Sequence, residues 1–176
     1  MVISTMTSLS HTLNYTLHTA SPFQLADLSA RVMHLLWVSS SRSPPSSMFR
    51  SFCSGIIQAT QISASVIVLA LYYVRRFKFH HPRTYAGVGS EYRMFTVALM
   101  LASKFLEDNT FTTKTWSEVS DIPACELAIM QREFLLAIDH RLNVSDQDYD
   151  LWISQLDALV FSSRPAKQTL HSNAIL

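Results

Sequence analysis

The sequence predicts an all-helical fold, and three observations support this prediction. The chain of 176 residues contains only three glycines, and its apolar residues recur at helical spacing over long segments. No segment shows the alternating, Val-, Ile- and Thr-rich pattern that is typical of a strand. Because 48% of the residues are hydrophobic, the chain can form a packed core, and its length suggests one domain.

The N-terminal quarter is predicted to hold one helix between two irregular segments. Residues 1–21 are rich in Ser, Thr and His and carry no Lys, Arg, Asp or Glu, so we expect a flexible tail. Residues 22–47 are expected to form an N-terminal helix, Pro22–Val38, followed by a Ser- and Pro-rich linker. The helix is indicated by apolar residues spaced three, four and seven apart: Leu25, Leu28, Val32, Leu35 and Leu36.

Residues 48–160 are predicted to form a continuous helical assembly, and residues 161–176 a C-terminal tail. Apolar periodicity and capping signals place six helices in this assembly. They are Phe49–Thr60, Gln61–Phe79, Glu91–Asp108, a short helix at Thr115–Glu118, a fifth from Pro123 to about His140, and a sixth from Ser145 to near Phe161.

The ends of these helices are predicted from single residues. Ser90 is expected to cap the third helix, and Thr115 with Glu118 has the spacing of a capping box. Pro123 suits the first position of the fifth helix. Ser145 is followed by Asp148 at a similar spacing, which predicts the start of the sixth helix.

The net charge of +1 is unevenly distributed along the chain. Residues 1–104 hold nine Lys and Arg against two acidic residues, whereas residues 105–176 hold five against eleven. This division favours association with a charged protein surface, and it argues against a nucleic-acid-binding protein. Since only 15% of the residues are charged, an exposed apolar patch would mark a partner site.

The chain shows no signal of secretion or membrane insertion. Its two cysteines, Cys53 and Cys125, form no disulfide framework, which fits an intracellular protein of the cytoplasm or nucleus. No Lys or Arg precedes Arg31, so a secretory signal is not expected. The apolar run Ile62–Val74 is well short of the roughly 20 residues that span a membrane.

Motifs of catalysis are also missing from the sequence. It contains no Gly-rich phosphate-binding loop, no nucleophile elbow and no kinase signature. His and Cys residues do not occur at metal-ligand spacing. We therefore expect a protein that is not an enzyme and that has no catalytic residues, no cofactor and no metal.

Two polar residues stand out beside or within the apolar faces of the third and fifth helices. In the third helix, Lys104 lies at the edge of the apolar surface, where it either extends along the helix to solvent or contacts a partner. In the fifth helix, Gln131 falls inside the apolar arc, and a buried amide needs hydrogen-bond partners. Those partners are supplied either by the core or by a docking protein.

Four blocks of the sequence together resemble the cyclin box, and they occur in its order and spacing. The blocks are TQISASVIVLALYYVRR, ALMLASKFLEDN, WSEVSDIP and MQREFLLAIDHRL, and the resemblance covers roughly Phe49–Val144. They are most similar to the Pcl-type and phosphate-pathway cyclins of fungi. The resemblance implies an all-α, five-helix cyclin-box fold with a flanking N-terminal helix. A second box is not expected, because too few residues follow Val144.

The resemblance also implies which residues bind a kinase. In cyclins, a lysine of the third helix and a glutamate of the fifth contact the regulatory helix of the kinase, among apolar neighbours. By motif position these contacts fall on Lys104 with Phe105, and on Gln131 with Leu135. Gln131 replaces the usual glutamate, so it cannot form an ion pair. His140, also assigned to the kinase-binding surface, stands where many cyclins have an aromatic residue.

The function implied by the resemblance is to bind and activate a cyclin-dependent Ser/Thr protein kinase. Two alternatives remain open at this point. A helical scaffold with a cyclin fold would bind without activating, and a transcription-factor-type cyclin-fold module would contact DNA or polymerase. No nucleic-acid or membrane partner is expected.

Two further points concern regulation and substrates. Ser43, which precedes Pro44 in the linker, is a candidate site for a proline-directed kinase. The substrate-docking motif of mammalian cell-cycle cyclins is not visible in MFRSFCSGII, the start of the first box helix.

Overall fold

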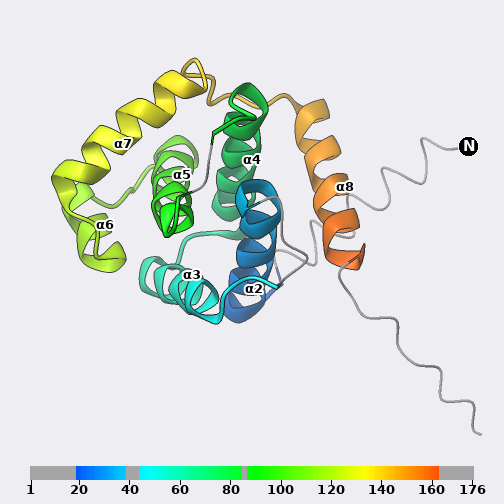
Figure 1. Ribbon diagram of the computed structural model, residues 1–176, viewed down its shortest axis with the longest axis horizontal. Helices are drawn as coiled ribbons and strands as arrows, with labels where there is room; N and C mark the ends of the chain where they lie inside the picture. The colour runs from blue at the N-terminus through cyan, green and yellow to red at the C-terminus, as the bar shows by residue number, and fades with distance from the viewer. Residues whose placement is uncertain (1–18, 39–43, 85–86, 163–176) are drawn as a thin grey trace, which may run out of the picture.

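The computed structural model describes residues 19–38, 44–84 and 87–162, and these residues form helices and no strand (Figure 1). The prediction of an all-α, cyclin-box fold is confirmed. The elements are α2 (Pro22–Met33), a π-helical turn η1 (His34–Val38), α3 (Ser47–Thr60), α4 (Ala64–His80), α5 (Ser90–Leu106), α6 (Thr113–Ser120), α7 (Ala124–Ala137) and α8 (Asp146–Ser162). Most of both predicted tails and part of the linker, including Ser43, lie outside the described residues.

Helices α4 and α5 form the centre of the molecule and pack against each other. Figure 1 shows α6 and α7 on one side of them and α8 on the other, with α2 and α3 next to the pair. Each central helix contains nine consecutive buried residues, 66–74 in α4 and 95–103 in α5. A helix that is apolar on all sides must be covered on all sides, which explains why the other helices surround this pair.

Five predicted helix starts, those of α3, α4, α5, α6 and α7, are wrong by one to three residues. Ser90 is the first residue of α5 and not its cap, because Gly89 occupies the cap position with φ of 79°, a left-handed conformation that glycine adopts without strain. The Ser90 hydroxyl instead donates to the Gly87 carbonyl at 2.7 Å. In α6 the cap is Thr112, whose hydroxyl accepts from the Thr115 amide at 3.2 Å, so the helix begins before Thr115.

Helices α4 and α7 begin later than predicted, and the residues at their starts explain why. Gln61 adopts φ of 48° and ends α3, so α4 begins only at Ala64, after the Ser63 cap. Pro123 is the cap residue of α7 and not its first helical residue. At α8 the prediction is confirmed, since the Ser145 hydroxyl accepts from the Asp148 amide at 3.2 Å.

Helix α7 ends at Ala137, three residues before the predicted end at His140. Asp139 and His140 adopt φ of 53° and 56°, which L-residues with a Cβ rarely do. Their amides bond to the Leu136 and Leu135 carbonyls at 3.1 and 2.8 Å, as at the end of many helices. The chain therefore turns sharply here and leads into α8.

Helix α8 is attached to the back of α4 through Trp152. The indole nitrogen of this buried residue donates to the Val68 carbonyl at 3.0 Å. Its ring meets Tyr72 edge to face, with 6.1 Å between the centroids, and the Arg75 guanidinium lies 5.5 Å from the ring centroid. These contacts position a helix that makes few others with the central pair.

The two cysteines have opposite surroundings. Cys53 of α3 is completely buried, and this burial raises the pKa of its thiol well above the usual range. Cys125, in the first turn of α7, is exposed. Among the helices described in residues 19–162, none is long and apolar enough to cross a bilayer.

Candidate functional site

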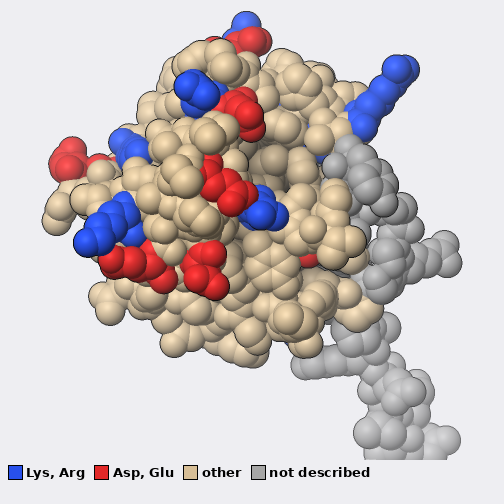
Figure 2. Space-filling model, turned by 60° about the vertical axis from the view of Figure 1, so that its left-hand side comes forward, with Lys and Arg blue, Asp and Glu red and all other residues tan. Residues whose placement is uncertain are grey.

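The end of α5 brings one cation and two apolar side chains to the surface. Lys104 is exposed, and the following Phe105 and Leu106 are 45% and 47% exposed. Figure 2 shows the side of the molecule on which α6 and α7 lie, where acidic and basic side chains are scattered over a largely uncharged surface. Exposed apolar side chains next to a single charge are typical of a surface that binds another protein.

Helix α7 presents the second half of this surface. Its buried residues Leu127, Phe134 and Ile138 face the core. Gln131 is half-buried beside them, and Leu135 is partly buried against the core. The Lys104 ammonium donates to the Gln131 amide oxygen at 2.9 Å. The hydrogen-bond partner of Gln131 is thus Lys104 of the neighbouring helix.

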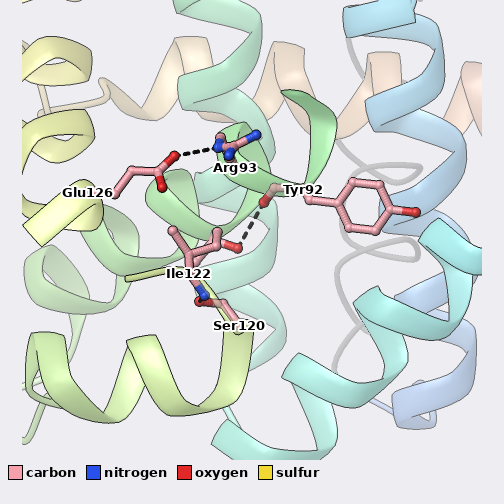
Figure 3. Close-up of polar contacts among 6 residues, drawn as sticks. Tyr92, Arg93, Ser120, Ile122 and Glu126 are labelled. Atoms are coloured by element: carbon pink, nitrogen blue, oxygen red, sulfur yellow. Dashed lines mark hydrogen bonds and ion pairs between the residues drawn. The ribbon is translucent and has the colours of Figure 1, made fainter. Parts of the chain in front are cut away.

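A second polar link fixes α7 on α5. The Arg93 guanidinium pairs with the Glu126 carboxylate at 2.5 Å (Figure 3). In the same view the Tyr92 ring points the other way, toward α3, where it meets Phe49 and Phe52 at centroid distances of 5.1 and 4.8 Å. Two adjacent residues of α5 therefore bind helices on opposite sides, which holds the Lys104–Gln131 contact in place.

The structure joins Lys104 and Gln131 by a hydrogen bond, and the predicted site residues Phe105 and Leu135 lie next to them along the same two helices. Lys104 and Phe105 lie at the end of α5, Gln131 and Leu135 lie one turn apart on α7, and the hydrogen bond joins the two pairs. We call these four residues the α5–α7 face. His140 is exposed but lies beyond the end of α7, after the left-handed turn, and so does not continue the helical surface.

The turn that carries His140 is held by two side chains of α4. The Tyr73 hydroxyl donates to the Leu142 carbonyl at 2.8 Å. The Arg76 guanidinium donates to the carbonyls of Arg141 and Asn143, the latter at 3.1 Å. The position of His140 relative to α4 is therefore fixed by hydrogen bonds to the backbone that follows it.

Some exposed apolar residues near this surface are not predicted by the sequence analysis. They are Leu106, Phe111, Ile129 and Leu136, which are 36% to 60% exposed. On a regular helix Ile129 and Leu136 lie about 140° to 160° from Gln131, so they face another direction than the α5–α7 face. Of the sequence features, only the low share of charged residues indicated that apolar side chains would be exposed.

The described residues contain no group of three or more His, Cys, Asp or Glu side chains that could hold a metal ion. The polar groups of the α5–α7 face itself are the Lys104 ammonium and the Gln131 amide, and the Arg93–Glu126 pair between the same helices is satisfied internally. Such an arrangement can recognise a protein surface through hydrogen bonds and apolar contact.

Comparison with known proteins identifies the family. The sequence model of the cyclin family, described as "Cyclin", matches residues 3–142. The chain belongs to the cyclin family. The match begins well before Phe49, where the resemblance of the sequence blocks starts, and it includes α2.

Two fungal cyclins and one plant cyclin are among the relatives of this chain. The G1/S-specific cyclin pas1 of Schizosaccharomyces pombe is 33% identical over 99 residues, which are 54% of this chain and 24% of pas1. PHO85 cyclin-5 of Saccharomyces cerevisiae is 30% identical over 111 residues, 57% of this chain and 46% of the relative. Cyclin-U4-1 of Arabidopsis thaliana is 25% identical over 114 residues, 65% of this chain and 56% of the relative.

These matches confirm the resemblance to Pcl-type fungal cyclins. They also support the prediction that the chain is not an enzyme, because proteins of this family are regulatory subunits. The chain spans between a quarter and little more than half of the length of these cyclins.

Proposed function

We propose that this cyclin is the regulatory subunit of a cyclin-dependent Ser/Thr protein kinase, and that the kinase binds the α5–α7 face. The observation that carries the proposal is the hydrogen bond between Lys104 and Gln131, which lies beside the exposed Phe105 and the partly buried Leu135. The relative named PHO85 cyclin-5 supports a kinase partner of the Pho85 type. His140, which lies beyond the end of α7, is assigned to the outer part of this interface.

The proposed mechanism is a shift of the kinase between two states. Docking holds the regulatory helix of the kinase inward, which completes the Lys–Glu ion pair of the kinase and orders its site for phosphoryl transfer. To shift a mostly inactive kinase to a mostly active one, the cyclin must bind the active form more tightly by about 5 kcal/mol. We place this complex in the cytoplasm or nucleus.

The proposal is tested by affinity capture of the full chain from cells of its source, followed by a kinase assay on the captured material. Leu135→Arg places a charge in an apolar contact that loses water on binding, which costs about 3 kcal/mol or more. We therefore expect the variant to lose at least about a hundredfold in kinase affinity and to recover no kinase activity.

A matched control separates this effect from misfolding. Leu151 is 58% exposed and belongs to α8, which lies on the other side of the central helices from α7 (Figure 1), so Leu151→Arg adds the same charge away from the α5–α7 face. Both variants should show the circular dichroism of the folded protein, with a lower melting temperature for Leu135→Arg, because that side chain packs partly against the core. Full kinase activation by a folded Leu135→Arg protein would show that the α5–α7 face is not the kinase-binding surface.

The neutral Gln131 favours one second candidate, a cyclin-fold scaffold that binds a kinase without activating it. Since an amide binds more weakly than a carboxylate, docking could be too weak to hold the regulatory helix inward. The same assay distinguishes the two functions. A scaffold would recover the kinase at the basal rate of its free catalytic subunit, whereas an activator would raise that rate.

A further inference from the structure

The outer face of α7 combines apolar and charged side chains that are exposed in the described part of the chain. Figure 1 shows α7 at the edge of the molecule, with α5 on its inner side. Ile129 and Leu136 are 48% and 60% exposed, and they lie about two helical turns apart on α7. Arg132 and Glu133, which lie between them in the sequence, are exposed as well. We call these four residues the outer stripe of α7.

The two charges of the outer stripe are available to a partner. Arg132 and Glu133 belong to none of the ion pairs that the described residues form. As neighbours in the sequence they point about 100° apart on the helix, so they do not face each other. The positions three and four residues away from them along α7 hold apolar side chains: Ala128, Ile129, Met130, Leu135, Leu136 and Ala137.

The outer stripe has a pattern that is complementary to itself. On a regular helix, the line from Ile129 to Leu136 runs midway between Arg132 and Glu133, which lie about 50° to either side of it. A two-fold axis that is parallel to α7 and in front of this line keeps the height of every residue and exchanges left with right. Arg132 of each copy then faces Glu133 of the other, with a difference in height of about 1.5 Å.

A parallel pair of α7 helices therefore combines apolar contacts with two ion pairs. Ile129 meets Ile129 and Leu136 meets Leu136 along the middle, as in other parallel helix pairs. One ion pair between Arg132 and Glu133 lies on each side of these contacts. In an antiparallel pair Arg132 would face Arg132 and Glu133 would face Glu133, and like charges repel each other. The charges of the outer stripe thus favour the parallel arrangement.

We infer that the outer stripe of α7 binds a second copy of this chain, with the two α7 helices parallel. Because Ile129 and Leu136 point about 140° to 160° away from Gln131, this contact goes beyond the proposed function and does not depend on it. Helix α7 has 14 residues and is about 21 Å long. A contact of this size is small, so we expect a weak dimer with a dissociation constant on the order of 10 to 100 µM.

Sedimentation velocity of the full chain, at concentrations from about 1 to 300 µM, tests this inference. Arg132→Glu makes both charges of the outer stripe negative, and Glu133→Arg makes both positive. Each variant alone should therefore raise the dissociation constant of the dimer at least about tenfold. An equimolar mixture of the two variants should dimerise again, because each copy then meets charges of the opposite sign.

A matched control separates the contact from an effect of net charge. Arg83 is exposed in the turn after α4, so Arg83→Glu changes the net charge by the same amount as Arg132→Glu but outside the outer stripe. The dissociation constant of Arg83→Glu should differ from that of the unchanged chain by less than about twofold. Circular dichroism should show the same helical content in all of these variants, because the substituted side chains are exposed.

The exposed Cys125, one turn before Ile129, reports the orientation of the two helices. In the parallel pair the two Cys125 residues lie at the same height near the middle of the contact, whereas in an antiparallel pair they lie about 22 Å apart along the helix. Since Cys53 is buried, a short bifunctional thiol crosslinker should join two copies through Cys125. Cys125→Ser should not be joined.

Each outcome decides the inference. Dimerisation that each single variant weakens and the mixture restores, together with the crosslink at Cys125, supports it. A chain that stays monomeric over the whole concentration range overturns it, and the outer stripe would then belong to a contact with a different protein. Dimerisation that neither single variant weakens also overturns it. A dimer that the crosslinker does not join would show that the parallel arrangement is wrong.

Discussion

Tyr73 shows how one buried side chain can determine the path of a distant segment. Its hydroxyl donates to the Leu142 carbonyl at 2.8 Å, and beside it Arg76 binds the carbonyls of Arg141 and Asn143. Three successive carbonyls of the α7–α8 connection are thereby satisfied without water. Burial raises the pKa of Tyr73 well above its usual range, and this outweighs the opposite effect of the Arg76 charge. The hydroxyl therefore stays protonated and able to donate.

Tyr73→Phe removes this donor and should lower the free energy of unfolding at neutral pH by about 1 kcal/mol. A tyrosine in the unfolded chain has a pKa of about 10, and the folded value is higher. The stabilising contribution of Tyr73 is therefore fully present below about pH 10 and is lost as the pH rises from there toward the folded pKa.

Urea unfolding at about pH 8 and at about pH 11 measures this contribution. The gap in stability between the unchanged protein and Tyr73→Phe should be present at the lower pH and shrink at the higher one. Other tyrosines titrate equally in both proteins, so the difference between the two isolates Tyr73. A gap that is equal at both pH values would mean that the hydroxyl does not titrate with a raised pKa.

At the scale of the helices, the apolar pattern of the sequence predicted which elements exist, but not where each one ends. Core helices such as α5 are long and apolar, and their periodicity depends on burial that any packing of the chain must supply. The ends depend on which of several nearby polar groups binds the backbone. Thr112 and Thr115 are both possible caps in sequence, and only the path of the preceding loop decides between them.

Residues in the left-handed backbone conformation were the other source of error in the predicted helix boundaries. Gln61, Asp139 and His140 all have positive φ, yet none is the glycine that usually signals this conformation. At His140 the conformation is maintained by contacts from α4, which is more than sixty residues away in the sequence. Such a boundary depends on tertiary structure and could not be predicted from the local sequence.

The candidate site could be predicted only in part, because its geometry also depends on tertiary structure. The helical wheel placed Lys104 at the edge of one apolar surface and Gln131 inside another, and the resemblance to cyclins assigned them to one site. Their distance of 2.9 Å depends on how α7 crosses α5, which the Arg93–Glu126 pair helps to set. The exposure of Leu136 depends on the absence of a covering helix among the described residues, and the pattern of a single helix does not reveal this.

Helix α8 should be the element most sensitive to a single substitution, because Trp152 provides its main attachment to α4. Trp152→Ala should lower the free energy of unfolding by about 3 to 5 kcal/mol. Native-state hydrogen exchange should show that amides of α8 lose more protection than those of α5.

The neighbouring Leu151 provides the control, because it is 58% exposed. Leu151→Ala should change stability by no more than about 0.5 kcal/mol. Equal effects of the two substitutions would show that α8 is not held by Trp152.

At the scale of the whole molecule, one continuous core connects the described helices from α2 to α8. Helix α2 precedes the segment that resembles the cyclin box, yet it packs against α3, α4 and α8. Its buried Met33 contributes to the same core as Trp116 of α6 and Trp152 of α8. A domain with one core of this kind is expected to unfold in a single cooperative step.

Met33→Ala should therefore destabilise the entire domain, by about 2 to 5 kcal/mol. The midpoints of urea unfolding measured by circular dichroism and by tryptophan fluorescence should shift together, because Trp37, Trp116 and Trp152 lie in three different parts of the core. If the two midpoints separated, α2 would unfold independently of the rest.

The contrast between the two cysteines has a practical consequence for studying the assembly of this protein. Because Cys53 is sealed within the core as a protonated thiol, a maleimide dye should react with Cys125 alone in the folded chain. Cys125 lies on α7 about 120° from Gln131, so the dye would sit near the α5–α7 face without covering it. The unaltered polypeptide thus carries its own attachment point for a fluorescent reporter of complex formation.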